Sequence, residues 1–538
     1  MRRAEPKPVL TGLHQLQGRQ LAVAMTGILL GLLLSALDST IVGTAMPRII
    51  ADLGGLDHYA WVATSYLLTS TAAVPIFGKL SDIYGRKWFY VGGMIFFLAA
   101  SALCGLSQSM GQLIAFRGLQ GIAGGILTAN AFAIIGDLFP PAERGKWQGV
   151  TSSVFGLASV VGPWLGGWLT DGPGWRWVFY VNIPLGLLVA AVLTVGLPAI
   201  RGHVRPAIDW FGAALIVAST VPLLLALSLG GSQFAWASPQ IIGLFVLAIV
   251  MTVLFVLVEQ RVPEPIIDPD LFRNRTFTIS VVSMFLVGAG MFGAIMYVPL
   301  FMQGVIGASA ANSGAVLTPM MLSLAVASTI GGQIISRSGR YKWAAVGGLA
   351  IMTIGLFLQS QFGVHTTFTQ ALAAMIVIGV GIGLAMPTFT LAVQNAFPLD
   401  RIGTVTAAVQ FFRSIGSTIG VAVMGTMLTN VLAAQLQVAL PADLTQTLPA
   451  NDAALLNPQA LASPEAAQAL HDRFASLPNG DQLFQELMTA MREALAIAMH
   501  DVFLTSAFVA GIAVVISLML REAPLQRRAR AAAPAMAD

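Results

Sequence analysis

Long apolar runs alternate with short polar segments along almost the whole chain. A helix needs about 20 apolar residues to cross the hydrocarbon layer of a bilayer. Because lipid offers the backbone no hydrogen-bond partners, such runs are expected to be helical. The pattern predicts an all-α integral membrane protein with 14 spans, at about residues 22–47, 59–78, 88–107, 111–136, 149–170, 178–198, 211–230, 240–259, 277–302, 313–335, 343–362, 370–396, 404–433 and 501–520.

Composition and charge support a membrane location. The chain has 538 residues, of which 56% are hydrophobic and 10% are charged, whereas soluble domains average about 25% charged residues. With the N-terminus in the cytoplasm, 22 of the 28 Lys and Arg residues fall in cytoplasmic segments, as the positive-inside rule requires. An even number of spans places both termini on that side, so we expect a multi-pass protein of the cytoplasmic (inner) membrane.

The same distribution explains the net charge of +4 without a nucleic-acid partner. Cys104, the single cysteine, lies in an apolar run, which excludes a disulfide framework. The expected partner of most of the surface is the lipid bilayer.

An internal repeat divides the chain into two halves. Residues 78–87 (GKLSDIYGRK) have a partial copy at residues 332–340 (GQIISRSGR), at an offset of 254. Glycines of residues 121–125 and the Phe-Pro pair at 139–140 recur at an offset of 258. Two matches at nearly the same offset indicate two six-span halves, and repeat-built membrane bundles bind their ligands at the interface of the repeats.

The repeat sets the predicted domain boundaries. We expect a cytoplasmic tail (1–21), an N-terminal six-helix bundle (22–200), a two-helix insert with cytoplasmic linkers (201–275), the first five helices of a C-terminal bundle (276–433), an extracytoplasmic helical loop (434–499), the last span (500–521) and a cytoplasmic tail (522–538). The insert is interpreted as a peripheral, lipid-facing hairpin in preference to a substrate-contacting element.

The 434–499 segment is much longer than the other external loops. Ser463 and Pro464 have the pattern of a helix start, and Asp481 is a second candidate start. Phe484, Leu487, Met491 and Leu495 then recur at helical spacing. Packing of a helical hairpin on the outer mouth is the preferred interpretation; a gate or a lipid-facing shuttle surface is the alternative.

Asp38 is the clearest acid deep within a span. A carboxylate there costs about 2.5–3.5 kcal/mol on insertion scales, so it is expected to have a partner or a function. Arg117 lies at the same depth to within about 5 Å if both helices rise 1.5 Å per residue. We therefore predict proton coupling at Asp38 with Arg117 as its partner, and a purely structural ion pair is the alternative.

Small residues collect in the fifth span, where Gly156, Gly162, Gly166 and Gly167 surround Pro163. Small residues let membrane helices approach closely, and proline can bend one. A glycine-rich stretch alone is weak evidence of function, but its place in the fifth span matters when it is taken together with the other motifs.

Together these motifs resemble the major facilitator superfamily, specifically its fourteen-spanner drug:proton antiporter branch. Residues 78–87 are similar to the signature after span two, Arg117 with Gln120 and Gly121 to the span-four motif, and residues 162–167 to the span-five antiporter motif. Residues 37–47 and 175–184 are similar to further signatures of that branch, although Gly43 stands where Asn is common.

The resemblance implies roles for individual residues. Gly78, Asp82, Gly85, Arg86 and Lys87 would form a conformational switch, in which Asp82 locks the halves through Arg86 and the N-terminal dipole of a helix starting near Gly403. Arg117 would respond to protonation of Asp38. The span-five glycines and Pro163 would limit leak and favour exchange.

A substrate cavity is expected between the halves at mid-membrane. The candidate lining residues are Asn130, Trp164, Gln394, Gln410 and Phe411, although the amides are equally compatible with hydrogen bonds between helices. Arg413 has three open readings: it contacts substrate, pairs with an acid or reaches the inner face.

The function expected from the resemblance is proton-coupled export of hydrophobic or cationic drugs by alternating access, by a monomer without a cofactor. Export of a lipid, siderophore or metabolite by the same fold is the alternative. An enzyme is disfavoured because the six histidines form no metal-binding spacing and no Gly-x-Ser-x-Gly or His-Glu-x-x-His motif is present. No nucleotide-binding loop indicates that ATP drives transport. A sensor or receptor is a third alternative, which transport measurements would exclude.

Overall fold

The structure, a computed structural model, consists of helices joined by short turns and loops in the part of the chain that it describes. The described residues are 18–54, 59–198, 209–231, 233–308, 316–398, 401–439 and 480–522, together with 16, 468, 470–472 and 474. The predicted helix start at Ser463 and the two terminal tails lie outside these residues, apart from the short segments next to the first and last helices.

The helices of the first half and the insert are α1 (Gly18–Leu53), α2 (Tyr59–Tyr84), α3 (Arg86–Gly105), α4 (Met110–Leu138), α5 (Pro141–Asp171), α6 (Trp177–Tyr180), α7 (Asn182–Gly196), α8 (Trp210–Leu229) and α9 (Pro239–Glu259). Those of the second half are α10 (Arg275–Ile295), α11 (Val298–Gly304), α13 (Leu317–Ser338), α14 (Lys342–Ser360), α15 (Phe368–Ala396), α16 (Ile402–Ala439) and α20 (Gly480–Leu518). A 3₁₀ turn, Pro269–Arg273, precedes α10.

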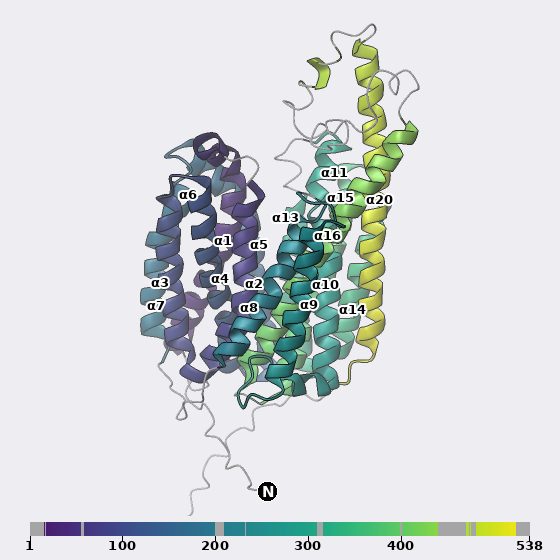
Figure 1. The fold of residues 1–538 in the computed structure, drawn as a ribbon. Helices are drawn as coiled ribbons and strands as arrows, with labels where there is room; N and C mark the ends of the chain where they lie inside the picture. The colour runs from purple at the N-terminus through teal and green to yellow at the C-terminus, as the bar shows by residue number, and fades with distance from the viewer. Residues whose placement is uncertain are drawn as a thin grey trace, which may run out of the picture.

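Two helix bundles stand side by side (Figure 1), one built from α1–α7 and the other from α10–α20. Buried apolar residues form separate clusters within each bundle. The small cluster of Val74, Ala129 and Ala407 is an exception, because it joins α2 and α4 to α16 across the boundary. This boundary between the bundles is called the seam below, and the end of the molecule that holds residues 78–87 is called the motif end.

Each of the predicted spans coincides with one or two helices of the structure. Twelve helices of the described chain are long and apolar enough to cross a membrane. Of the other two predicted spans, residues 277–302 begin with a shorter apolar stretch, Arg275–Met291, and residues 59–78 lie within α2, which contains Pro75. The structure is consistent with 14 spans, and the exact number remains a prediction.

Two predicted spans are interrupted. The span at 178–198 is split into α6 and α7, and the span at 277–302 ends α10 at Ile295 before α11 begins. Pro299 lies in the first turn of α11, where its missing N–H leaves no helical hydrogen bond unmade. The hydropathy of these runs is continuous, which is why they read as single spans in the sequence.

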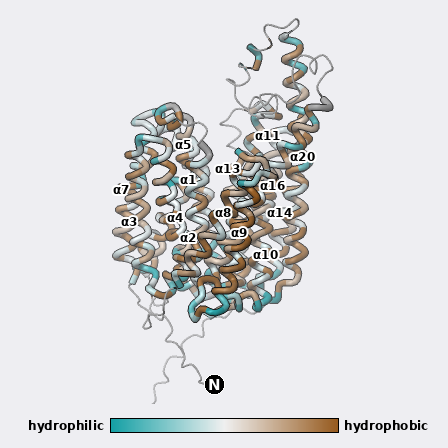
Figure 2. Tube along the Cα trace, in the orientation of Figure 1, coloured by the Kyte–Doolittle hydropathy of each residue, from teal (hydrophilic) through white to brown (hydrophobic). Residues whose placement is uncertain are grey.

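The insert packs against the seam from one side (Figure 1). Helix α8 contacts α2 and α16, and α9 contacts α8. Helix α9 is strongly apolar along its length (Figure 2) and only 17% of its most apolar stretch is buried. Its exposed apolar surface agrees with the predicted lipid-facing hairpin, whereas α8 is more than half buried and bridges the two bundles.

The repeat is visible in the backbone. Gly85, between α2 and α3, and Gly339, between α13 and α14, have φ of +97° and +71°, values that residues with a side chain rarely adopt. Ser109 caps α4 through the N–H of Gln112, and Thr367 caps α15 through that of Gln370, 258 residues later. Equivalent turns and caps therefore recur at the offsets seen in the sequence.

Two helices extend beyond the bundles at the end opposite the motif end (Figure 1). Helix α16 continues to Ala439, and α20 runs without a break from Gly480 to Leu518. The domain boundaries predicted at 433/434 and 499/500 therefore fall inside continuous helices. Phe484, Leu487, Met491 and Leu495 are all buried, so this stripe packs inward.

Candidate functional site

Asp38 lies inside the N-terminal bundle and is completely buried. Its Oδ2 accepts a hydrogen bond from Arg117 Nη1 of α4 at 2.5 Å, and its Oδ1 accepts from Gln120 Nε2 at 2.8 Å and from Asn182 Nδ2 of α7 at 2.9 Å. The predicted pair of Asp38 and Arg117 is therefore in direct contact. The described hydrogen-bond partners of this carboxylate all belong to the first bundle.

Arg117 is held by a second set of contacts. Its Nη1 also donates to Gln120 Oε1 at 2.8 Å, and its guanidinium carbon lies 4.4 Å from the ring centre of Tyr66. Tyr66 in turn shares a 3.2 Å hydrogen bond with Ser35 of α1. Asn182 also donates to Ser101 Oγ of α3 at 3.0 Å.

These contacts connect one carboxylate to five helices of the bundle, namely α1, α2, α3, α4 and α7. Breaking a buried ion pair by removing one partner leaves an uncompensated charge and costs about 3–5 kcal/mol. Protonation of Asp38 would remove its negative charge and release Arg117 from the ion pair. A change of one proton would thus act on the packing of most of the bundle.

A second charged cluster lies at the motif end. Arg86 forms ion pairs with Asp82 and, through Nε at 2.8 Å, with Asp137 of α4. Asp82 Oδ2 accepts hydrogen bonds from the backbone N–H and the hydroxyl of Thr404, at 2.8 and 2.9 Å. Thr404 lies in the first turn of α16, so the carboxylate of one bundle binds the positive end of a helix in the other.

Close packing accompanies this contact. A Cβ atom added to Gly78 would lie 2.5 Å from Ala407 Cβ, and one added to Gly149 would lie 2.7 Å from the backbone of Ser328. A Cβ on Gly136 would lie 2.7 Å from Ile402. Glycine at these positions lets the bundles meet backbone to backbone at the motif end.

Polar side chains complete the seam there. Arg144 donates to the carbonyls of Phe139 and Gln394, at 2.8 and 3.4 Å. Gln148 of α5 reaches Gln394 Oε1 at 3.5 Å, while Gln394 Nε2 donates to Thr406 at 3.0 Å. Gln394 is only 1% exposed and joins both bundles, so it closes the seam in this structure.

Farther from the motif end, α5 leaves α13 and follows α1. A Cβ on Gly156 would still meet Met321 of α13 at 3.3 Å, whereas Gly162 and Gly166 pack against Thr40 and Thr44 of α1. Thr40 also donates to the carbonyl of Ala158 at 3.1 Å. Pro163 interrupts the hydrogen-bond ladder of α5 beside these contacts, and Gly167 faces open space.

The five candidate substrate residues are dispersed. Asn130 is buried in α4 with its Oδ1 unpartnered among the described residues, and Trp164 is 72% exposed. Gln394 closes the seam, and Gln410 accepts a hydrogen bond from Arg413 Nε at 2.9 Å. Phe411 is buried against the insert and α2. The structure does not gather these five around one described cavity.

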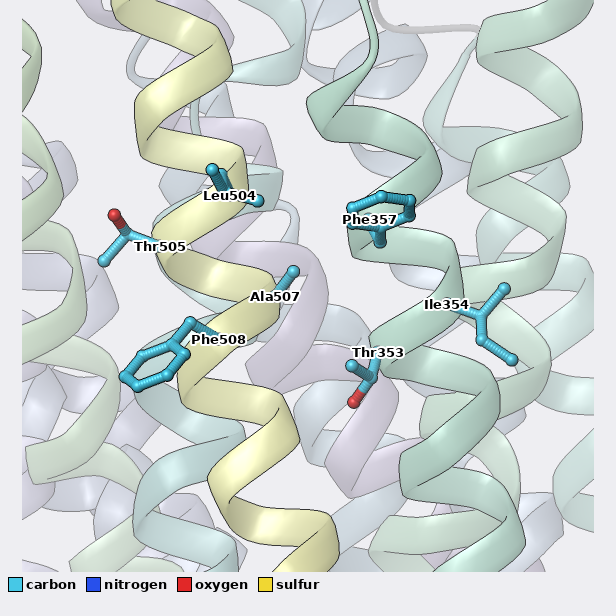
Figure 3. A pocket seen from close by; sticks show the side chains of 7 residues that line it. All are labelled: Thr353, Ile354, Phe357, Leu504, Thr505, Ala507 and Phe508. Carbon is cyan, nitrogen blue, oxygen red and sulfur yellow. The ribbon is translucent and has the colours of Figure 1, made fainter.

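Two cavities lie elsewhere. An open groove of about 690 Å³ runs between α14 and α20 (Figure 3), lined by Thr353, Ile354, Phe357, Leu504, Thr505, Ala507 and Phe508. Phe357 and Phe508 are 51% and 69% exposed, so the groove is on the outer, lipid-facing surface. A more polar cavity of about 490 Å³ lies at the end opposite the motif end, around Asp52 and Arg176.

Sequence reasoning missed several members of the site. Gln120 and Asn182 complete the shell of Asp38, and Asp137 and Thr404 complete that of Arg86 and Asp82. Gln120 and Asn182 both lie within quoted motifs, and polar side chains within apolar spans would have been the signal for them. Among the described residues no group of three His, Cys, Asp or Glu side chains could hold a metal ion.

Comparison with known proteins identifies the family of this chain. The profile of the Major Facilitator Superfamily matches residues 28–421. The chain is 42% identical over 520 residues to "Multidrug transporter protein MdtP" of Bacillus subtilis, with 94% of each chain covered. It is 44% identical over 405 residues to "Multidrug resistance protein 3" of the same organism, covering 75% of this chain and 79% of that protein.

A solved structure supports the fold. The human organic anion transporter MFSD10 (TETRAN) aligns with a TM-score of 0.58 at 14% identity, covering 92% of this chain and all of that one. At such low identity the likeness concerns the fold alone. The family profile and the two bacterial relatives together establish that this chain belongs to the Major Facilitator Superfamily and is a multi-pass membrane transporter, not an enzyme.

Proposed function

We propose that the chain exports small hydrophobic drugs from the cytoplasm in exchange for protons, by alternating access, as a monomer in the cytoplasmic membrane with both termini inside. The names of the two Bacillus relatives support the drug substrate. The coupling proposal is carried by one observation, the buried ion pair of Asp38 and Arg117.

The mechanism follows from the contacts of that pair. A proton from outside neutralises Asp38 and frees Arg117, whose other contacts extend to α2 and within α4. The bundle repacks, substrate leaves, and the Asp82–Thr404 contact at the motif end opens. On release of the proton to the cytoplasm, each charge that crosses the field contributes about 2.3 kcal/mol per 100 mV.

The predicted orientation places the motif end in the cytoplasm. The seam is packed at that end, through Gly78, Gly149 and Gln394, which is the arrangement that the outward-facing state of the proposed cycle requires. The α5 glycines next to Thr40 and Thr44 would then hold α1 and α5 together while the bundles rotate.

The expectation of cationic substrates depended on the charge of Asp38. Because Arg117 already matches that charge, Asp38 gives no preference for a cation while the pair is intact. The alternative of lipid export draws on the interpretation of residues 434–499 as a lipid-facing shuttle surface. Its described apolar stripe is buried, which favours a drug over a lipid.

The test is transport in proteoliposomes with an imposed pH gradient. A panel of fluorescent drugs should be taken up by wild-type vesicles and not by Asp38→Asn, which should insert normally. Asp52→Asn is the matched control. Asp52 is an acid of the same helix, and it forms an exposed ion pair with Arg176 at 2.7 Å. Gradient-driven uptake by Asp38→Asn at the wild-type rate would exclude Asp38 as the coupling site.

A further inference from the structure

Arg413 is a charged residue in the middle of a span. It lies 11 residues after Ile402, the first residue of α16, and so about 16 Å from the motif end at 1.5 Å per residue. That is about half of a hydrocarbon layer of about 30 Å. An arginine at this depth is costly and is expected to line a pathway or to have a partner.

Near the motif end, the helix face that carries Arg413 lies at the seam. Ile402, Thr406 and Gln410 precede it by about three, two and one helical turns and share this face. Ile402 packs against Gly136 of the other bundle, and Thr406 accepts a hydrogen bond from Gln394 of α15. Arg413 continues the same row toward mid-membrane, where its backbone packs against Gly288 of α10 and its side chain is only partly buried.

The charge of Arg413 is not matched by an acid. Within the described part of the chain no carboxylate lies within ion-pair distance of it, whereas Arg117 and Arg86 each have one. Its described side-chain contact is the one from Nε to Gln410 Oε1 at 2.9 Å. Of the three readings that the sequence left open, pairing with an acid and reaching the inner face thus find no support here.

The hydrogen bond to Gln410 orients the guanidinium of Arg413. By accepting from Nε, Gln410 restrains the plane of the group and leaves the two terminal nitrogens as donors. Two such donors match the two oxygens of a carboxylate, which arginine binds bidentately. In a site of low dielectric this interaction is stronger than in water.

We propose that Arg413, positioned by Gln410, is an anion-binding subsite at the seam, and that the exported compounds include amphiphiles with one carboxylate. The inference rests on the proposed export function, of which it names a substrate class. It differs from the expectation of cationic drugs because the unmatched charge at mid-membrane is positive, while that of Asp38 is paired.

Binding to the purified transporter tests this without a proton gradient. The probes are a dansyl-labelled octanoate and its primary amide, which differ in charge and share the same apolar body. Wild-type protein should bind the acid about tenfold more tightly than the amide, the scale of one charge-assisted hydrogen bond. Arg413→Gln should bind the two equally, and Arg413→Lys should keep part of the preference.

Two further variants separate the subsite from general damage. Arg273→Gln makes the same substitution at an exposed pair with Asp270 and should keep the full preference. Gln410→Ala retains the charge of Arg413 and removes the contact that orients its guanidinium. It should therefore weaken binding of the acid probe and leave binding of the amide probe unchanged. It also provides a second measurement if Arg413→Gln does not fold.

The outcomes are distinct from those of the transport test. A preference for the acid that Arg413→Gln abolishes supports the subsite even if no pH gradient drives uptake. Equal wild-type affinity for both probes, or an unchanged preference in Arg413→Gln, would overturn it, whatever the proton-coupling experiments show.

Discussion

Three donors converge on the carboxylate of Asp38 in α1. Two of them belong to α4 and the third to α7. Such a shell compensates the cost of placing a charge in a low-dielectric interior. The protonation state of this single carboxyl group therefore affects its contacts with the neighbouring helices. The chemistry that the proposed mechanism needs is therefore a property of the shell and not of Asp38 alone.

Asp52 provides a pH-dependent contact that can be measured separately. Hydrogen bonds from Arg176 and Trp175 lower the pKa of this carboxyl below its usual value of 3.8. Its contribution to stability is therefore present above pH 4 and disappears as the pH falls through the lowered pKa. The thermal stability of wild type should exceed that of Asp52→Asn at pH 7, and the difference should vanish in acid. A difference independent of pH would contradict this assignment.

At this scale the sequence allowed the pairing of Asp38 with Arg117 to be predicted, because depth follows from counting residues along two helices. It could not supply the rotation of each helix about its axis, which decides whether a side chain faces lipid, the bundle or the seam. Phe411 was therefore placed in a substrate cavity, although it packs against the insert. Gln410 and Gln394 do lie at the seam, where they bind Arg413 and Thr406.

At the scale of helices, glycine determines which pairs come close. Along α5, the glycines first face α13 and then α1. The change occurs between Gly156 and Gly162, just before Pro163 and the stretch similar to the antiporter motif. The helix thus belongs to the seam at one end and to its own bundle at the other.

Gly166 and its neighbour Gly167 form a matched pair. A Cβ on Gly166 would lie 2.8 Å from the backbone oxygen of Ile41, while one on Gly167 would meet nothing within 4 Å. Gly166→Ala should destabilise the protein by about 1–3 kcal/mol through overpacking, and Gly167→Ala should have little effect. Thermal unfolding of the two variants in detergent measures the difference, and equal midpoints would be inconsistent with close packing of α1 and α5.

The extension of α20 beyond the bundles is similarly testable. Leu487 is fully buried there, while its neighbour Glu486 is at the surface. Leu487→Ala should cost about 2–5 kcal/mol as a cavity in a packed core, and Glu486→Ala should be close to neutral. A neutral Leu487→Ala would favour the alternative of a mobile gate or shuttle surface.

Helix spans were predictable because hydropathy reports burial in lipid directly. Their ends were not, since α16 and α20 continue as amphipathic helices after the apolar run stops. The break before Pro299 was also missed, because a proline at a helix start and a proline within a span look alike in hydropathy.

On the scale of the whole molecule, two bundles with separate cores meet most tightly at one end. The repeat had indicated two halves, and the shared turn glycines and caps follow it. The insert bridges the halves through α8 while α9 faces outward. The conformation, by contrast, depends on side-chain contacts across the seam that no repeat reveals.

Those contacts predict a reversible lock. In a Cys104→Ser background, cysteines at Gly78 and Ala407 should form a disulfide across the seam, since the two positions touch. Oxidation should stop transport and reduction should restore it, because the contact must open in each cycle. Gly78→Cys alone controls for the added bulk. Unchanged transport by the oxidised pair would show that the bundles do not separate here.

The most direct test of proton-coupled export is the movement of protons evoked by substrate. Vesicles containing the transporter and a pH-sensitive dye, at equal pH on both sides, receive a drug that the panel has identified. Wild-type vesicles should show a proton flux opposite to that of the drug, and Asp38→Asn vesicles should show none. Drug movement by the wild type with no proton flux, or an undiminished flux in Asp38→Asn, would contradict the account.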